Sequence, residues 1–298
     1  MEFSAEKRLN AVLALLPPRI ARAVGSADLD PAVEEIRLRS GRPSQVVTSS
    51  GDALISPPLA PAEASSLLER LCGHSVYAME EELKMGFIPL EGGWRVGVCG
   101  RPVTANGRIE RLVAVSCFNF RIVREVKGCA ERLMHMLTES GRPVSAMIVS
   151  PPGVGKTTLL RDISRCFSNG IGADPVKVAI ADERGELAGC VGGIPTFDVG
   201  ERTDVFELCP KAEAIPLLVR SMSPKVIITD EIGSYGDAEA VGEAARCGVA
   251  VIASAHASSF EELKRRAPLA EVLRTGAIRR LLLLSRSGGR LNVSRMTL

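Results

Sequence analysis

The chain has 298 residues, enough for two domains of ordinary size, each with its own hydrophobic core. An apolar content of 46% and a charged content of 24% are typical of a globular protein, and a net charge of +2 gives no bulk electrostatic reason to bind nucleic acid. Eight scattered cysteines without a C-x-x-C pair, together with three histidines, argue against a zinc site and a disulfide framework, so we expect a cytoplasmic protein with reduced thiols. No run of about 18 apolar residues occurs, so we expect no membrane span of its own.

The first 125 residues predict a small α+β domain. Apolar residues at helical spacing are interrupted by Pro17 and Pro18, which predicts two short helices rather than one. In chain order, the patterns predict two helices in 5–24, a strand–turn–strand unit in 34–47, a helical region in 61–84, a glycine-rich hairpin from 86 with a turn at Asn106 and Gly107, and a strand in 113–123. Residues 126–144 are predicted to form a linking helix.

Residues 145–298 predict an α/β domain with a mostly parallel sheet and helices on both faces. Buried strands alternate with helices, and the strands end in polar side chains. The predicted strands lie at 147–149, 176–181, 226–229, 248–255 and 281–284. In doubly wound folds the ligand binds beyond the carboxyl ends of the strands, so we expect the polar groups there to form one site.

The strand at 147–149 leads into a phosphate-binding loop. Gly153 and Gly155 allow successive N–H groups to point into one concavity, Lys156 can bridge the β- and γ-phosphates, and the Thr157 hydroxyl can ligate Mg²⁺. The usual first glycine of this motif is replaced by Ser150, so we interpret it as a variant loop. The predicted cofactor-binding residues are Ser150, Pro151, Pro152, Gly153, Val154, Gly155, Lys156, Thr157 and Thr158.

Acidic residues and one histidine follow three other predicted strands. Asp230 is predicted to hold Mg²⁺, and the adjacent Glu231 to polarise the attacking water. Asp182 and Glu183 form a second acidic pair, which either serves the catalytic site or caps the next helix. His256 either contacts the γ-phosphate or is a hydrogen-bonded loop residue.

The phosphate loop, the two acidic pairs and the strand-terminal histidine resemble the secretion ATPases of type II and type IV machines. Several longer segments extend the resemblance to the stage III sporulation protein AA family within that superfamily. They are residues 34–43, 119–128, 150–162, 182–189, 202–211 and 220–233.

This resemblance implies a hexameric, Mg²⁺-dependent ATPase with a RecA-like core. It implies arginines that reach the phosphates, from the matching stretch of the N-terminal domain or from the core, within one subunit or between neighbours. The candidates are Arg121, Arg124, Arg95, Arg101, Arg202 and Arg220. Secretion ATPases carry their catalytic glutamate in the acidic box, so the base is Glu231 or Glu183, and we favour Glu231.

The resemblance also implies a biological setting. The protein would act at the cytoplasmic face of the mother-cell membrane during endospore formation and energise a membrane channel complex. Two alternatives remain: a nucleic-acid-associated P-loop ATPase, which an aromatic content of 4% disfavours, and a nucleotide-gated scaffold with little turnover.

Overall fold

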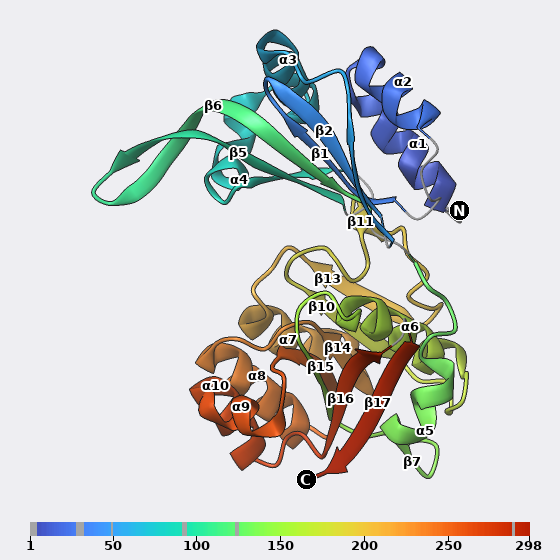
Figure 1. Cartoon of the computed structure of the whole chain (residues 1–298). Helices are drawn as coiled ribbons and strands as arrows, with labels where there is room; N and C mark the ends of the chain where they lie inside the picture. The colour runs from blue at the N-terminus through green and yellow to red at the C-terminus, as the bar shows by residue number, and fades with distance from the viewer. Residues whose placement is uncertain (1–4, 28–32, 49, 91–93, 123–124, 288–289) are drawn as a thin grey trace. The chain divides into compact units, whose positions relative to one another are not determined.

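The computed structural model describes residues 5–27, 33–48, 50–90, 94–122, 125–287 and 290–298. The chain forms two compact units, Met1–Arg124 and Glu125–Leu298, each with its own core (Figure 1). Among the described residues, none of the helices combines the length and the apolar character that crossing a bilayer requires.

The N-terminal unit is built on a six-stranded antiparallel sheet with helices packed against it, as the sequence predicts. Side chains such as Ile36 and Val46 of the sheet and Ile20 and Leu67 of the helices share one buried core. The strand order is β3-β2-β1-β6-β5-β4. The strands are β1 (Val33–Arg39), β2 (Arg42–Thr48), β3 (Gly51–Ile55), β4 (Phe87–Leu90), β5 (Trp94–Ala105) and β6 (Arg108–Arg121), and the helices are α1 (Ala5–Leu15), α2 (Pro18–Ser26), α3 (Pro61–Leu71), the 3₁₀ turn η1 (Val76–Met79) and α4 (Glu80–Lys84).

The turn predicted at Asn106 and Gly107 joins β5 to β6. Both residues have positive φ, 51° and 74°, which is the backbone of a tight hairpin turn. The hairpin extends well beyond the rest of the sheet (Figure 1).

The linking helix predicted over 126–144 is wrong. The chain forms only a 3₁₀ turn, η2 (Glu131–Leu133), and one short helix, α5 (Met134–Leu137), before the strand pair β7 (Thr138–Glu139) and β8 (Arg142–Pro143). Ser140 and Gly141 between these strands have φ of 50° and 78°, which a continuing helix cannot contain. The apolar residues around 133–137 therefore mark a single buried turn rather than a long helix.

The C-terminal unit is built on a seven-stranded sheet of order β13-β10-β14-β15-β9-β16-β17, in which only the pair β16–β17 is antiparallel within the described residues. A small two-stranded pair, β11 (Cys190–Val191) and β12 (Ile194–Pro195), is separate. The main strands are β9 (Ala146–Ser150), β10 (Val178–Asp182), β13 (Thr203–Glu207), β14 (Val226–Thr229), β15 (Ala250–His256), β16 (Arg280–Ser287) and β17 (Arg290–Thr297), and the helices are α6 (Lys156–Asn169), α7 (Lys211–Met222), α8 (Tyr235–Arg246), α9 (Phe260–Arg265) and α10 (Ala267–Arg274).

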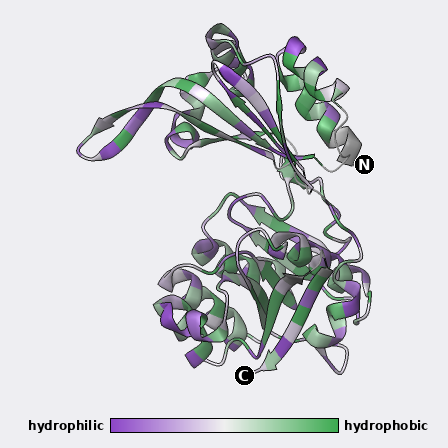
Figure 2. Cartoon of the chain, in the orientation of Figure 1, coloured by the Kyte–Doolittle hydropathy of each residue, from purple (hydrophilic) through white to green (hydrophobic). Residues whose placement is uncertain are grey.

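Helices cover both faces of this sheet. Every residue of β9, β10 and β14 is buried, as a parallel sheet covered on both sides requires, and Figure 2 shows these strands as hydrophobic. Alternate strand residues such as Met147 and Ile227 share a core with α7, α8 and α10. Helix α6 packs against the same strands but contributes nothing to that core, so it lies on the opposite face. The predicted fold class, an α/β core preceded by an α+β unit, is confirmed.

Candidate functional site

The predicted phosphate loop connects the central strand β9 to α6. Gly153 and Gly155 have φ of 76° and 110°, which strongly favours glycine, and a Cβ at either position would meet nothing within 4 Å. Ser150 is not among the described residues with positive φ, which explains why glycine is not needed there. Its hydroxyl instead donates a hydrogen bond of 2.9 Å to the carbonyl of Pro151.

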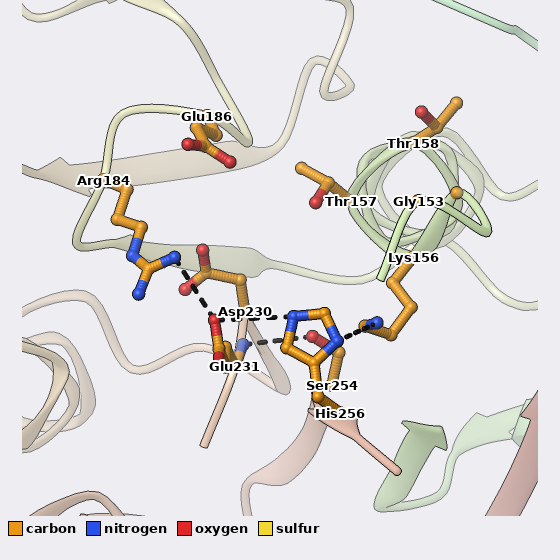
Figure 3. A pocket seen from close by; sticks show the side chains of 11 residues that line it. Gly153, Lys156, Thr157, Thr158, Arg184, Glu186, Asp230, Glu231, Ser254 and His256 are labelled. Carbon is orange, nitrogen blue, oxygen red and sulfur yellow. Dashed lines mark hydrogen bonds and ion pairs between the residues drawn. The ribbon is translucent and has the colours of Figure 1, made fainter. Parts of the chain in front are cut away.

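The loop forms one wall of a pocket of about 250 Å³. Four neighbouring strands, β9, β10, β14 and β15, end at this pocket, as the sequence predicts. The lining residues are Gly153, Gly155, Lys156, Thr157, Thr158, Arg184, Glu186, Asp230, Glu231, Ser254 and His256 (Figure 3). Pro152 and Val154 belong to the loop but do not line the pocket, whereas Ser150 and Pro151 contact Lys156 behind it.

Lys156 begins α6 and is 7% exposed. Its Nζ donates to the carbonyls of Ser150 and Pro151 at 3.0 and 3.2 Å and lies 2.8 Å from Nδ1 of His256. Burial lowers the pKa of this ammonium, while the charge of Glu231 acts in the opposite direction. A buried cation surrounded mainly by neutral oxygens is suited to bind an anion in the pocket.

Asp230 directly follows β14 and carries an unsatisfied buried oxygen. Its Oδ1 accepts no hydrogen bond from the described residues and lies 3.5 Å from Nζ of Lys211. Burial raises the pKa of Asp230 to about 6, although Lys211 acts in the opposite direction. An unsatisfied carboxylate oxygen across the pocket from the Thr157 hydroxyl is the donor set that Mg²⁺ prefers (Figure 3). The residues present therefore fit this ion.

The raised pKa of Asp230 predicts a stability effect. Because the folded protein holds this proton more tightly than the unfolded chain, the carboxylate reduces stability increasingly as the pH rises from about 4 to about 6. Without Mg²⁺, Asp230→Asn should therefore increase the free energy of unfolding at pH 7 by up to about 3 kcal/mol and change it little at pH 4. Urea unfolding at both pH values measures this, with Asp204→Asn at an exposed position of β13 as the control. An equal change at both pH values would contradict it.

Glu231 is held by side chains from both sides of the pocket. Its Oε2 lies 3.2 Å from Nη1 of Arg184 and 3.7 Å from Nε2 of His256. Its backbone N–H donates to Oγ of Ser254 at 3.0 Å. His256 thus stands between Lys156 and Glu231, in agreement with the prediction that this histidine belongs to the site (Figure 3). Ser254 was missed, although its spacing of two from His256 places both on one face of β15.

The second acidic pair occupies the turn after β10, residues 182–188, which we call the acidic turn. Asp182 is fully buried, and its carboxylate accepts the backbone N–H groups of Glu186, Leu187 and Ala188 at 2.9–3.0 Å. Its role is structural, because it fixes the acidic turn.

Glu183 does not line the pocket, and its carboxylate pairs with Lys211. Glu186 and Arg184 line the pocket in its place, and sequence reasoning missed both. Gly185 could have indicated Glu186. With φ of 66°, this glycine lets the chain turn so that the residue after it lies at the pocket.

Removing the carboxylate of Asp182 should destabilise the fold. Asp182→Ala would leave three buried N–H groups without their acceptor, so we expect the free energy of unfolding to fall by about 3 kcal/mol or more. Asp204→Ala should change it by less than about 0.5 kcal/mol, because that side chain is exposed. Chemical denaturation of both variants tests this. Equal stability of the two would show that the acidic turn does not depend on Asp182.

Arg161 joins α6 to the acidic turn. Residues 159–168 of this helix are all buried. The guanidinium of Arg161 donates to the carbonyls of Leu187 and Glu186, both at 2.7 Å, and lies 3.7 Å from the ring centroid of Phe197. The helix that carries Lys156 and the turn that carries Glu186 are therefore bonded directly to each other.

Arg202 lies at the opposite end of the sheet from the pocket. It precedes β13, and its Nη1 donates at 3.0 Å to the carbonyl of Ser168, in the last turn of α6. The position of Arg202 does not support a role in the pocket of its own subunit, because a residue before a strand lies at the amino edge of the sheet. A role through a neighbouring subunit stays a prediction.

Arg220 is not among the described residues that line the pocket either. Arg220 is exposed at the end of α7, where its Nε donates to the carbonyl of Pro216 at 3.2 Å. Arg121 belongs to the N-terminal unit, where its Nε lies 3.4 Å from Oε1 of Glu35. Arg124 lies outside the described residues.

Comparisons with known proteins agree with this fold. Two solved structures are similar in fold: the Legionella pneumophila ATPase DotB (TM-score 0.62, 18% identity, 94% of this chain and 80% of that chain) and the pilus retraction motor PilT with bound ADP (TM-score 0.58, 16% identity, 94% and 82%). Stage III sporulation protein AA of Bacillus subtilis (strain 168) is 40% identical over 291 residues, which cover 97% of this chain and 94% of the relative. The family described as Sporulation stage III, protein AA matches residues 6–296. The chain belongs to this family, and its fold is that of the RecA-like secretion ATPases.

Proposed function

We propose that this chain is a Mg²⁺-dependent ATPase that works as an oligomeric motor. One observation carries the proposal: a glycine-formed phosphate loop, a buried lysine, an unsatisfied aspartate oxygen and a glutamate line one pocket. The similarity to structures described as an ATPase and as a motor with bound ADP supports it.

Several residues of the pocket have a place in this reaction. The N–H groups of the phosphate loop and the ammonium of Lys156 bind the phosphates, and Thr157 and Asp230 would hold Mg²⁺. The ion, when bound, neutralises charge that develops on the phosphate oxygens. Glu231 accepts a proton from the attacking water. His256 lies between Lys156 and Glu231 and fixes the positions of these two side chains relative to each other.

Glu231 remains the proposed base, and Glu186 replaces Glu183 as the second candidate. Glu231 and Glu186 both line the pocket, whereas the carboxylate of Glu183 is paired with Lys211 outside it. Glu231 is favoured because it is connected to Lys156 through His256.

The biological role follows from the family. As a member of a sporulation stage III family, the protein would act in the mother cell, at the cytoplasmic face of the membrane, as a hexamer that energises a channel complex. In such a hexamer Arg121 or Arg124, in its own site or in a neighbouring one, or Arg202, in a neighbouring one, would stabilise the transferring phosphoryl group.

Hydrolysis measured against protein concentration tests the proposal. Mg²⁺-dependent ATP turnover that rises more steeply than linearly with protein concentration would support a motor with sites shared between subunits. Tight ATP binding without turnover at any concentration would favour a nucleotide-gated scaffold instead.

A further inference from the structure

Arg184 reaches into the pocket from the wall opposite the phosphate loop (Figure 3). It lies in the acidic turn, next to Gly185, and its side chain is 53% exposed. Its base is fixed, because the carboxylate of Asp182 holds the backbone immediately after it. The backbone of Arg184 is thus held in place, whereas its exposed guanidinium can change direction without disturbing the hydrophobic core.

In the structure, a series of polar contacts links Lys156, Glu231 and Arg184 in the pocket. Nζ of Lys156 lies 2.8 Å from Nδ1 of His256, and Nε2 of His256 lies 3.7 Å from Oε2 of Glu231. The same Oε2 lies 3.2 Å from Nη1 of Arg184. Glu231, the proposed base, therefore begins in an ion pair rather than free to accept a proton.

The ion pair between Arg184 and Glu231 is of a kind that exchanges partners easily. It is partly open to water, and such pairs contribute little stability. A terminal phosphate carries more than one negative charge, and its oxygens match the two-pronged guanidinium. An arriving triphosphate would therefore compete successfully with the single carboxylate of Glu231 for the half-exposed guanidinium of Arg184.

We propose that Arg184 binds the terminal phosphate of the nucleotide within its own subunit and gives up Glu231 in doing so. This inference rests on the proposed function, because it assumes that ATP occupies the pocket. As a consequence, nucleotide binding must precede hydrolysis. Glu231 loses its ion-pair partner, and can accept a proton, only when a triphosphate is present. The ion pair between Arg184 and Glu231 is then an autoinhibitory contact.

Paired binding measurements test this proposal. Calorimetric titrations would use the full chain with Mg²⁺ and two ligands, ADP and a non-hydrolysable ATP analogue. Arg184→Gln should weaken binding of the analogue roughly 10- to 100-fold and change ADP binding less than about threefold, because ADP lacks the terminal phosphate. Arg184→Lys keeps the charge and should fall between this variant and the wild type.

Two controls separate the possible failures. Arg274→Gln removes an arginine from an exposed pair with Glu271 and should bind both ligands normally. Lys156→Ala should weaken both. If the wild type binds neither ligand, or if Lys156→Ala binds like the wild type, the proposed function fails and the inference with it. If those proteins behave as expected while Arg184→Gln weakens both ligands equally or neither, the inference alone is overturned.

Discussion

Lys156→Ala is expected to reduce ATP turnover at least about 100-fold and to weaken nucleotide binding. The ammonium of Lys156 is the positive charge that donates hydrogen bonds to the carbonyls of Ser150 and Pro151 at the phosphate loop. Without it, these oxygens would present their negative ends to the incoming phosphates. The loss of turnover and of nucleotide affinity should therefore exceed the loss expected from removing a single hydrogen bond. A coupled assay of ATP hydrolysis measures the turnover, and a nucleotide titration measures the affinity.

The matched control for this variant is Lys264→Ala. Lys264 lies on α9, pairs with Glu261 at the surface and takes no part in the pocket. Its removal should leave turnover within about twofold of the wild type. Normal turnover by Lys156→Ala would show that the pocket around the phosphate loop is not where ATP is hydrolysed.

Glu231→Gln is expected to bind ATP at least as tightly as the wild type but to hydrolyse it roughly 10²- to 10⁴-fold more slowly, because an amide cannot accept the proton of the attacking water. The substitution keeps the size of the side chain and leaves the backbone hydrogen bond to Ser254 in place. Single-turnover hydrolysis with ATP in excess of its dissociation constant separates this loss from any change in binding.

Two further variants complete that experiment. Glu239→Gln, at an exposed position of α8, should have no effect. Glu186→Gln tests the other carboxylate of the pocket, and a loss confined to this variant, with Glu231→Gln still active, would move the role of base to Glu186. Equal, moderate losses in both would indicate that the two carboxylates share the water.

Much of the C-terminal unit could be predicted because its signals are local. The apolar run at 226–228, followed closely by acidic residues, is typical of a buried strand, and Gly153, Gly155 and Lys156 define their loop by backbone conformation and charge. The convergence of four strand ends on one pocket follows from the rule that parallel strands share a carboxyl edge.

Other features depend on contacts that a linear pattern does not contain. The choice between Glu183 and Glu186 is made by Asp182, whose carboxylate gathers three N–H groups and so decides which side chain of the acidic turn faces the pocket. The apolar residues at 133, 134 and 137 have helical spacing whether the helix runs for one turn or four, so this pattern alone could not give its length. The place of Arg202 at the far edge follows from β13, a strand that the sequence analysis did not predict.

The enclosure of helix α6 has a consequence for how the site can deform. Residues 159–168 are buried on every side, and Arg161 bonds the helix to the acidic turn, so this wall of the pocket is stiff. A stiff wall cannot tilt without creating voids in a close-packed core. We expect the parts of the pocket that move to be the partly exposed side chains on the wall opposite the phosphate loop. The phosphate loop itself would stay fixed while these side chains respond to whether ATP or ADP is bound.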